Sequence, residues 1–109
     1  MGVVIRRFDV FLINLDPTVG SEIQKTRPCL VVSPDELNRA ICTVIIAPLT
    51  SQGKAYPTRV ACSFGGKEGR VVLDQLRTVD KGRLVRKLGH LDDATSRLVA
   101  DKLVELFPF

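Results

Sequence analysis

Short apolar runs separated by turn residues fill most of this 109-residue chain and limit the folds that it can adopt. Ile41–Ala47 is the run richest in β-branched residues, which is typical of a buried strand. Phe8–Leu15 is largely apolar on both faces, which indicates a central strand. Short strands that follow one another through turns, without intervening long helices, predict a small antiparallel barrel. The other predicted strands are Cys29–Ser33, Thr58–Ser63, Arg70–Leu73 and Gln75–Val79.

Two helices are predicted beside these strands. Ser33 and Glu36 have the spacing of a capping box, and Pro34 occupies the first helical position. This first helix is expected to run to about Asn38. Asp92 is expected to cap a terminal helix. One face of the terminal helix should pack on the barrel, and its apolar positions are Ala94, Leu98, Val99, Leu103 and Leu106.

The size and composition are those of one globular domain covering residues 1–109. Apolar residues make up 45% of the chain and charged residues 26%, which is the ordinary globular range. The longest apolar run, Val44–Leu49, is far shorter than the roughly 20 residues of a membrane span. Asp9 and Asn14 interrupt the apolar stretch that follows the first arginines, so no signal peptide is expected.

The cysteines indicate a reducing compartment. Cys29, Cys42 and Cys62 are odd in number and have no C-x-x-C spacing, so neither a disulfide nor a metal site is favoured. Each lies in an apolar run and is expected to behave as a small buried hydrophobe. This usage predicts a cytoplasmic protein.

Charge is distributed unevenly along the chain, although the net charge is only +4. Residues 50–91 contain nine basic residues and three acidic ones, a net charge of +6. The segments before and after are neutral and acidic, respectively. A basic middle of this kind suits a nucleic acid or another acidic partner.

The sequence lacks the usual catalytic motifs. It contains no phosphate-binding G-x-x-x-x-G-K motif, no G-x-G-x-x-G and no G-x-S-x-G. Its single histidine, His90, stands just before the terminal helix, where a structural or solvated role is expected. Acidic residues do not cluster as ligands of a hard cation would. We therefore expect no metal and no cofactor.

Two polar stretches between predicted strands hold the remaining candidates for chemistry. Glu22 and Arg27 belong to the first stretch, and Thr50, Gln52 and Lys54 to the second. Cations of this kind hold a phosphate and neutralise the charge that develops on it, and a carboxylate takes a proton from a nucleophile. RNA supplies its own nucleophile, the 2′-hydroxyl. The alternative is that the charges of the first stretch form an exposed ion pair, worth about 1 kcal/mol or less.

Motifs along nearly the whole chain resemble the MazF/PemK family of toxin endoribonucleases. The most specific combination is the Gly-Ser-Glu and Arg-Pro block of residues 20–28, followed at the right distance by Thr50. The matching segments are Asn14–Glu22 (NLDPTVGSE), Arg27–Ser33 (RPCLVVS), Pro48–Gln52 (PLTSQ), Tyr56–Pro57, Leu73–Lys81 (LDQLRTVDK) and Leu88–Asp92 (LGHLD).

The resemblance implies an SH3-like antiparallel barrel with a C-terminal helix, working as a homodimer. It also implies sequence-specific, metal-independent cleavage of single-stranded RNA, with a 2′,3′-cyclic phosphate and a 5′-hydroxyl as products. The implied protein partner is a cognate antitoxin with an acidic, flexible tail.

The resemblance also implies roles for individual residues. Arg27 matches the family's catalytic arginine, Thr50 its catalytic threonine, and Glu22 an acidic residue of the motif. Arginine is effectively always protonated, so we expect Arg27 to clamp the phosphate and donate a proton, with Glu22 as candidate proton acceptor. The residues expected to contact RNA are Ser21, Lys25, Gln52, Lys54, Asp74 and Gln75.

Two other functions remain open at the level of sequence. One is a non-catalytic toxin that resembles CcdB and acts by binding a protein target such as gyrase. The other is a module that binds acidic peptides or RNA without turnover. A cleavage assay in the presence of a chelator distinguishes these functions from a ribonuclease.

Overall fold

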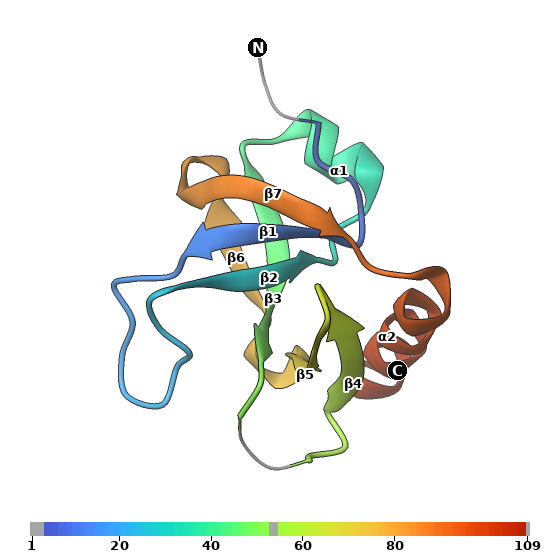
Figure 1. The fold of residues 1–109 in the computed structure, drawn as a ribbon. Coiled ribbons are helices and arrows are strands. Elements are labelled where there is room, and N and C mark those ends of the chain that lie inside the picture. Colours follow the sequence, from blue (N-terminus) through green and yellow to red (C-terminus); the bar gives the residue numbers. More distant parts are fainter. Residues whose placement is uncertain (1–3, 53–54, 109) are drawn as a thin grey trace.

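The computed structural model describes residues 4–52 and 55–108, which form a curled antiparallel sheet with a long helix packed beside it (Figure 1). The sheet order is β4-β5-β3-β2-β1-β7, and β6 pairs with β3. The strands are β1 (Asp9–Asn14), β2 (Thr26–Val31), β3 (Thr43–Thr50), β4 (Arg59–Phe64), β5 (Lys67–Val72), β6 (Arg77–Asp80) and β7 (Leu84–His90). The helices are α1 (Asp35–Ala40) and α2 (Asp93–Leu106), with short 3-10 turns η1 (Leu73–Gln75) and η2 (Lys81–Arg83).

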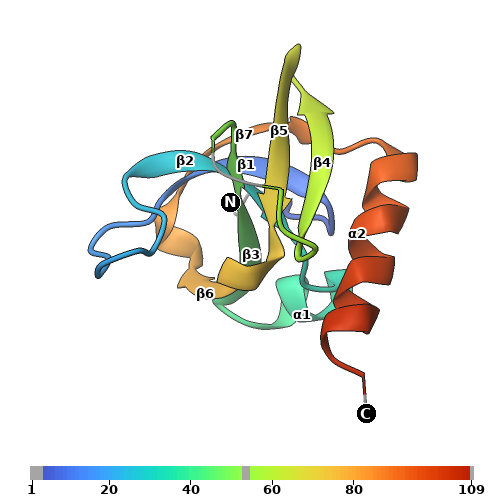
Figure 2. The same ribbon diagram turned by 90° about the horizontal axis from the view of Figure 1, so that it is seen from below.

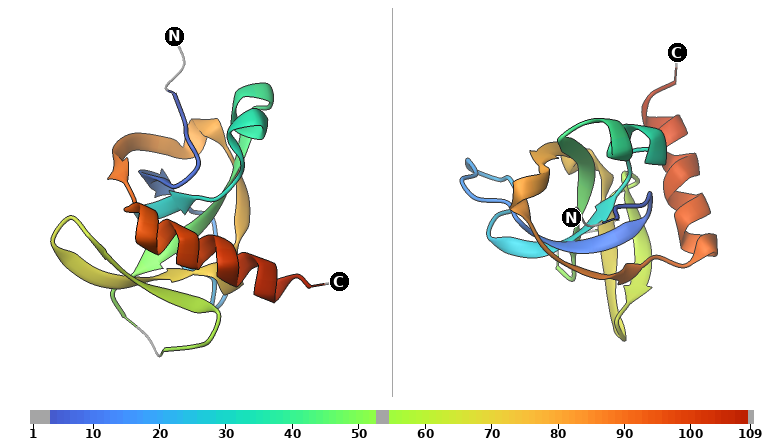
Figure 3. Two further views of the ribbon diagram at one scale, coloured as in Figure 1. Left: turned by 90° about the vertical axis from the view of Figure 1, so that its right-hand side faces the viewer. Right: turned by 90° about the horizontal axis from the view of Figure 1, so that it is seen from above.

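Strand β3 organises the sheet because it pairs with three others along its length. Its first half pairs with β6, its middle with β2 and its end with β5. The sheet therefore curls around β3, as the views from below and from above show (Figures 2 and 3). This arrangement confirms the predicted antiparallel barrel followed by a terminal helix.

Two apolar clusters lie on the two faces of the curled sheet. The first is built around Phe11, Ile13 and Ile46. The second lies around Leu30 and Val71, and α2 contributes side chains to it. Because successive residues of a strand point to opposite faces, alternate residues of β2 and β3 supply the two clusters. The sheet is thus buried on both sides along these two strands, which gives the site described below a rigid base.

The packed face of α2 differs from the predicted one. The predicted Ala94 and Leu98 are exposed, the predicted Val99 is buried as expected, and Ser96, which is not among the predicted positions, is buried as well. The buried Ser96 is accommodated because its hydroxyl donates a hydrogen bond to the carbonyl oxygen of Leu91 at 3.4 Å. The prediction for Leu103 and Leu106 is confirmed, since both pack against the second apolar cluster. Figure 3 shows the helix lying across the strands.

Three local predictions are also wrong. Pro34 occupies the N-cap of α1 with no side-chain cap, because the Ser33 hydroxyl donates to Asn38 instead. Cys42 is exposed rather than buried, since it lies just before β3 begins. Strand β7 is absent from the predicted set. Asp92, by contrast, accepts a hydrogen bond from the Thr95 backbone N–H at 2.9 Å and caps α2 as predicted.

A buried carboxylate joins β1 to β7. Asp9 is 1% exposed and accepts a hydrogen bond from the Arg6 backbone N–H at 2.8 Å. Its two oxygens also lie 3.2 Å from Lys87 Nζ and 2.9 Å from His90 Nδ1. A buried charge requires partners of this kind. The single histidine therefore has a structural contact between two strands.

No helix within residues 4–52 and 55–108 is long and apolar enough to cross a membrane.

Candidate functional site

The register of the sheet places Arg27 and Thr50 on neighbouring strands. Cys29 pairs with Pro48 in the antiparallel β2–β3 ladder. Arg27 lies two residues before Cys29 on β2, and Thr50 lies two residues after Pro48 on β3, so both stand just beyond the paired residues of this ladder. Both residues line a cavity of about 230 Å³, so the structure brings together the two residues that the sequence singled out first.

Both apolar and charged residues line this cavity. Pro28, Leu49 and Phe64 supply apolar surface, while Lys67 and Glu68 add charges to that of Arg27. Apolar surface accommodates a ribose or a base, and cations attract a phosphate. The cavity therefore has the character expected of a site for one nucleotide and its phosphate.

The Arg27 guanidinium is held by one of its nitrogens. Nε donates to the carbonyl oxygen of Gln24 at 2.7 Å. Among the described residues, this is the single hydrogen bond that the Arg27 side chain makes. The two Nη groups can therefore donate together to a phosphate, which is the geometry that gives arginine its strength as a phosphate ligand.

The Thr50 hydroxyl shapes the start of the next loop. Oγ1 accepts from the Gln52 backbone N–H at 3.2 Å and donates to the Gln52 carbonyl oxygen at 3.3 Å. Thr50 is the last residue of β3, so the rigid sheet fixes its position. The Gln52 side chain is not part of this turn, and Lys54 lies outside the described residues.

The cysteines near Arg27 are neutral thiols. Burial raises the pKa of Cys29 to about 12, and Arg27 and Arg77 offset that rise only in part. Burial, assisted by Asp92, also raises the pKa of Cys62, which lines the same cavity as Arg27. Since the thiolate is the reactive form, neither cysteine is suited to act as a nucleophile at neutral pH.

Glu22 lies in a different cavity from Arg27 and Thr50. Its Oε1 accepts a hydrogen bond from the Val19 backbone N–H at 2.6 Å, within its own loop. Glu22 lines a cavity of about 250 Å³ together with Asp74 and Gln75. The loop that carries Glu22 extends away from the sheet between β1 and β2 (Figure 1).

Lys25, at the end of this loop, has a left-handed backbone with φ of 72°. Its backbone N–H donates to Asp16 Oδ1 at 3.1 Å, and its carbonyl oxygen accepts from the Leu15 N–H at 3.0 Å. These bonds close the loop at its base, and the Lys25 side chain is exposed.

Gln75 in η1 fastens the same loop to the barrel. Its Oε1 accepts from the Ile23 backbone N–H at 2.7 Å, and its Nε2 donates to the Ser21 carbonyl oxygen at 3.4 Å. Ser21 thus contacts another candidate residue through its backbone. The side chain of Gln75, expected to contact RNA, already positions the loop between β1 and β2.

Asp74, the neighbour of Gln75, fastens the segment before β4. Its carboxylate accepts from Arg59 Nε and Nη2 at 3.1 and 3.2 Å and from Thr58 Oγ1 at 2.9 Å. The hydrogen bond from Arg59 is the main reason that the pKa of Asp74 is lowered. Arg59 also lies over the Tyr56 ring, 4.8 Å from its centre. Sequence reasoning missed Arg59 because no local pattern indicates a partner 15 residues away.

In the described part of the chain, no three His, Cys, Asp or Glu side chains gather closely enough to hold a metal ion.

The chain is thus a small curled antiparallel barrel that carries an arginine and a threonine in one cavity. The chain belongs to the family of PemK-like, MazF-like toxins of type II toxin–antitoxin systems, whose model matches residues 6–107. It is 44% identical over 96 residues to endoribonuclease EndoA of Bacillus subtilis, covering 83% of each chain.

Solved structures of MazF-type proteins have the same fold. The structure is similar to that of MazF from Deinococcus radiodurans, with a TM-score of 0.84, 29% identity and coverage of 96% of this chain and 97% of the other. It is also similar to a mycobacterial endoribonuclease in complex with its cognate antitoxin, with a TM-score of 0.80, 26% identity and coverage of 96% and 98%. The predicted family and fold are confirmed.

Proposed function

We propose that this protein is the endoribonuclease toxin of a toxin–antitoxin pair and cleaves single-stranded RNA at specific sequences without a metal ion. The observation that carries this proposal is that Arg27 on β2 and Thr50 on the neighbouring strand β3 line one cavity together with further charged residues. Support comes from the family match and from the 44% identity to an endoribonuclease.

The proposed reaction uses the 2′-hydroxyl of the substrate as nucleophile. The 2′-oxygen forms a bond to the adjacent phosphorus while the bond to the 5′-oxygen breaks. A 2′,3′-cyclic phosphate and a 5′-hydroxyl result. The proton from the 2′-hydroxyl passes to a base, and the leaving 5′-oxygen receives a proton. No hydrolytic water is needed in this step, which is why metal activation of water is unnecessary.

Arg27 and Thr50 act on the phosphate in this scheme. The two Nη groups of Arg27 hold the non-bridging oxygens and stabilise the charge that develops on them, and one of them protonates the leaving oxygen. The Thr50 hydroxyl donates to a non-bridging oxygen in exchange for its long bond to Gln52. Both donors stand on strand ends, so little reorganisation is needed during the reaction.

Glu22 is proposed as the proton acceptor, and this role requires its carboxylate to leave Val19 and turn toward the Arg27 cavity. Glu22→Gln is then expected to lower kcat about 10²-fold, because glutamine keeps an oxygen for the Val19 N–H but takes no proton. Single-turnover cleavage rates across pH measure the effect. If Glu22→Gln cleaves at the wild-type rate and Glu22→Ala does not, Glu22 serves the loop alone and the acceptor is another group.

The remaining candidates are proposed to bind the RNA around the cleaved bond. Exposed Lys25 attracts the phosphate backbone from the first loop, as Lys54 does from the second. Asp74 and Gln75 read bases only after exchanging their present partners, and their more immediate effect is to hold both loops in place. The residues proposed to contact RNA are Ser21, Lys25, Gln52, Lys54, Asp74 and Gln75.

The proposed partners are RNA, a second copy of this chain in a homodimer, and an antitoxin with an acidic tail, all in the cytoplasm. The net charge of +6 over residues 50–91 favours an acidic tail and an RNA backbone alike. A similar mycobacterial endoribonuclease was solved with its cognate antitoxin, which supports a partner of that class.

Purified protein is expected to cut a mixed-sequence single-stranded RNA at a few positions, equally well with and without EDTA. Primer extension maps the cuts, and phosphatase resistance of the 3′ ends until acid treatment identifies the cyclic phosphate. Loss of cleavage in EDTA, restored by Mg²⁺, would contradict the metal-independent mechanism. Intact RNA after incubation with several substrates would contradict the ribonuclease and favour a CcdB-like toxin that binds a protein.

A further inference from the structure

A second arginine lies next to Thr50, on the neighbouring strand β5 rather than on β2, which carries Arg27. Thr50 pairs with Arg70 in the antiparallel β3–β5 ladder. Opposite residues of such a pair share a face. Thr50 therefore has an arginine beside it on each neighbouring strand: Arg27 on β2 and Arg70 on β5.

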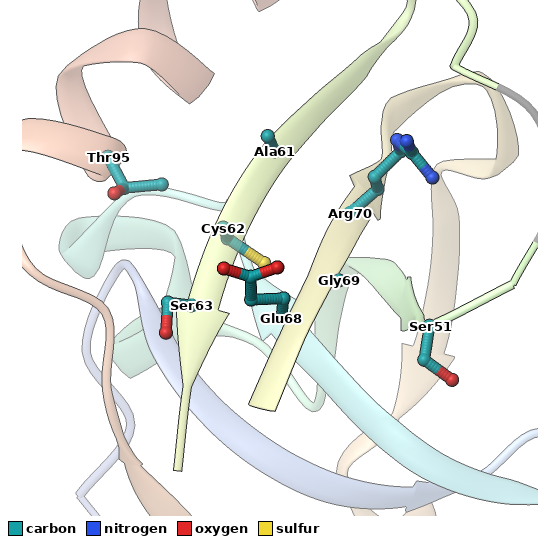
Figure 4. A pocket seen from close by; sticks show the side chains of 8 residues that line it. All are labelled: Ser51, Ala61, Cys62, Ser63, Glu68, Gly69, Arg70 and Thr95. Carbon is teal, nitrogen blue, oxygen red and sulfur yellow. The ribbon is translucent and has the colours of Figure 1, made fainter. Parts of the chain in front are cut away.

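Arg70 lines a cavity with a volume of about 530 Å³, separate from the two described above. Figure 4 shows Arg70 extending from β5, with Ser51 at the end of β3 and Thr95 on α2 beyond β4. Ser51, Ser63 and Thr95 also line this cavity, and Figure 4 shows Ser63 and Thr95 on the side of β4 and α2, away from Arg70. A guanidinium and a serine hydroxyl are both donors for phosphate oxygens.

The Arg70 cavity lies next to the Arg27 cavity. Four residues line both of them: Ser51, Cys62, Glu68 and Gly69. We treat the two adjacent cavities together as one groove, which reaches from β2 past the end of β3 to the β4–β5 hairpin. Because neighbouring strands lie about 4.8 Å apart, β2 and β5 are separated by roughly 10 Å.

The groove as a whole is basic. Arg27, Lys67 and Arg70 supply three positive charges, and Glu68 supplies one negative charge. The cations on either side of Thr50 attract an RNA strand in the groove, and Glu68 repels it. Removing the charge of Arg70 should therefore lower the affinity for RNA, and removing the charge of Glu68 should raise it.

Resting on the proposed ribonuclease function, we infer that the Arg70 cavity is a second phosphate-binding subsite for the same RNA strand. Arg27 holds the phosphate that is cleaved, and Arg70, with the Ser51 hydroxyl, holds a neighbouring phosphate. The strand then runs across β3 and β5 over the outer end of the sheet. Arg70 binds substrate in this arrangement and takes no part in the bond changes.

The subsite is tested with an RNA oligonucleotide that spans a mapped cleavage position and carries a 2′-deoxy nucleotide there, so that it binds without being cut. One phosphate at a time is replaced by an uncharged methylphosphonate, and Kd is measured by fluorescence anisotropy. Arg70→Gln keeps the aliphatic stem of the side chain. Arg86→Ala, an exposed change on β7 outside the three cavities, is the matched control.

Arg70→Gln is expected to raise Kd about tenfold and to reduce the slope of log Kd against log salt by about 0.7, as for one lost phosphate contact on a single strand. A methylphosphonate at one position beside the cleaved bond should raise the Kd of the wild-type protein about tenfold and leave the Kd of Arg70→Gln unchanged. Glu68→Gln should lower Kd, and Arg86→Ala should change it less than twofold.

Two results would overturn the subsite: Arg70→Gln binds the RNA as tightly as wild type, or the same methylphosphonate weakens the binding of Arg70→Gln as well. In either case, cleavage by the wild-type protein would still support the ribonuclease. If wild type neither cuts nor binds single-stranded RNA, the proposed function fails, and the subsite fails with it.

Discussion

Replacing Arg27 by alanine is expected to lower kcat for RNA cleavage about 10²- to 10³-fold and to leave the chain folded. The guanidinium is the cation nearest to Thr50 on β2, so its removal leaves the charge that develops on the phosphate without its main donor. The hydrogen bond lost from Nε to Gln24 is exposed, and such a bond contributes only about 1 kcal/mol to stability. Single-turnover rates at saturating protein measure kcat, and urea unfolding measures the stability.

Two further variants separate the position of the charge from its mere presence. Arg27→Lys keeps the charge but loses the planar fork, so we expect an intermediate rate. Arg86→Ala removes an exposed charge from β7 and should cleave at the wild-type rate. Wild-type cleavage by Arg27→Ala would remove Arg27 from the chemistry and would overturn the proposed mechanism.

The sequence identifies Arg27 and Thr50 as candidates through the family motif, although both lie outside the predicted strands Cys29–Ser33 and Ile41–Ala47. What the sequence did not indicate is the element that holds Thr50. The prediction treats Thr50 as a loop residue, whereas it ends β3 and pairs with Arg70. Pairing with β5 is a long-range property that no local pattern encodes.

The contacts of Asp74 and Gln75 illustrate the same limit. Both are predicted to contact RNA, and Gln75 is also the first residue of the predicted strand Gln75–Val79. In the folded chain their side chains bind Arg59 and Ile23, which come from segments far along the sequence. Composition and spacing identify such residues as candidates, but only the fold shows which groups they hydrogen-bond to.

Strand β7 was missed for a physical reason. It lies at the end of the sheet order, and Val85, Arg86 and Lys87 in its middle are all exposed. An edge strand of this kind has no buried alternation, so the period-2 pattern that reveals β1 and β3 is missing. Similarly, the packed face of α2 includes Ser96, which hydrophobic periodicity excludes.

Gly69 on β5 is expected to be as important to catalysis as a residue that touches the substrate. A Cβ added there would lie 2.7 Å from the Thr50 carbonyl oxygen, a separation that Cβ atoms essentially never show. The atom it meets is backbone, so β5 and β3 must move apart at the pair between Thr50 and Arg70. Gly69→Ala therefore displaces the Thr50 hydroxyl from the phosphate that Arg27 holds.

Because a misplacement of about 1 Å costs on the order of 10²-fold in rate, Gly69→Ala should lower kcat about 10²-fold. The strain should also lower the free energy of unfolding by about 1–3 kcal/mol. Gly82→Ala is the matched control, since its Cβ would meet only the end of the Asp80 side chain, at 3.0 Å, away from the cavity. We expect wild-type kcat from that control.

Comparing kcat with KM separates the displacement of Thr50 from simple obstruction. Gly69 lines both cavities of the groove. A methyl group that only narrowed the groove would raise KM and leave kcat unchanged. Displacement of Thr50 lowers kcat even at saturating RNA. A Gly69→Ala protein that unfolds at lower urea but cleaves at the wild-type kcat would contradict the placement of Thr50 in the chemistry. The rate at saturation therefore decides whether the close approach of β5 to β3 serves catalysis or stability alone.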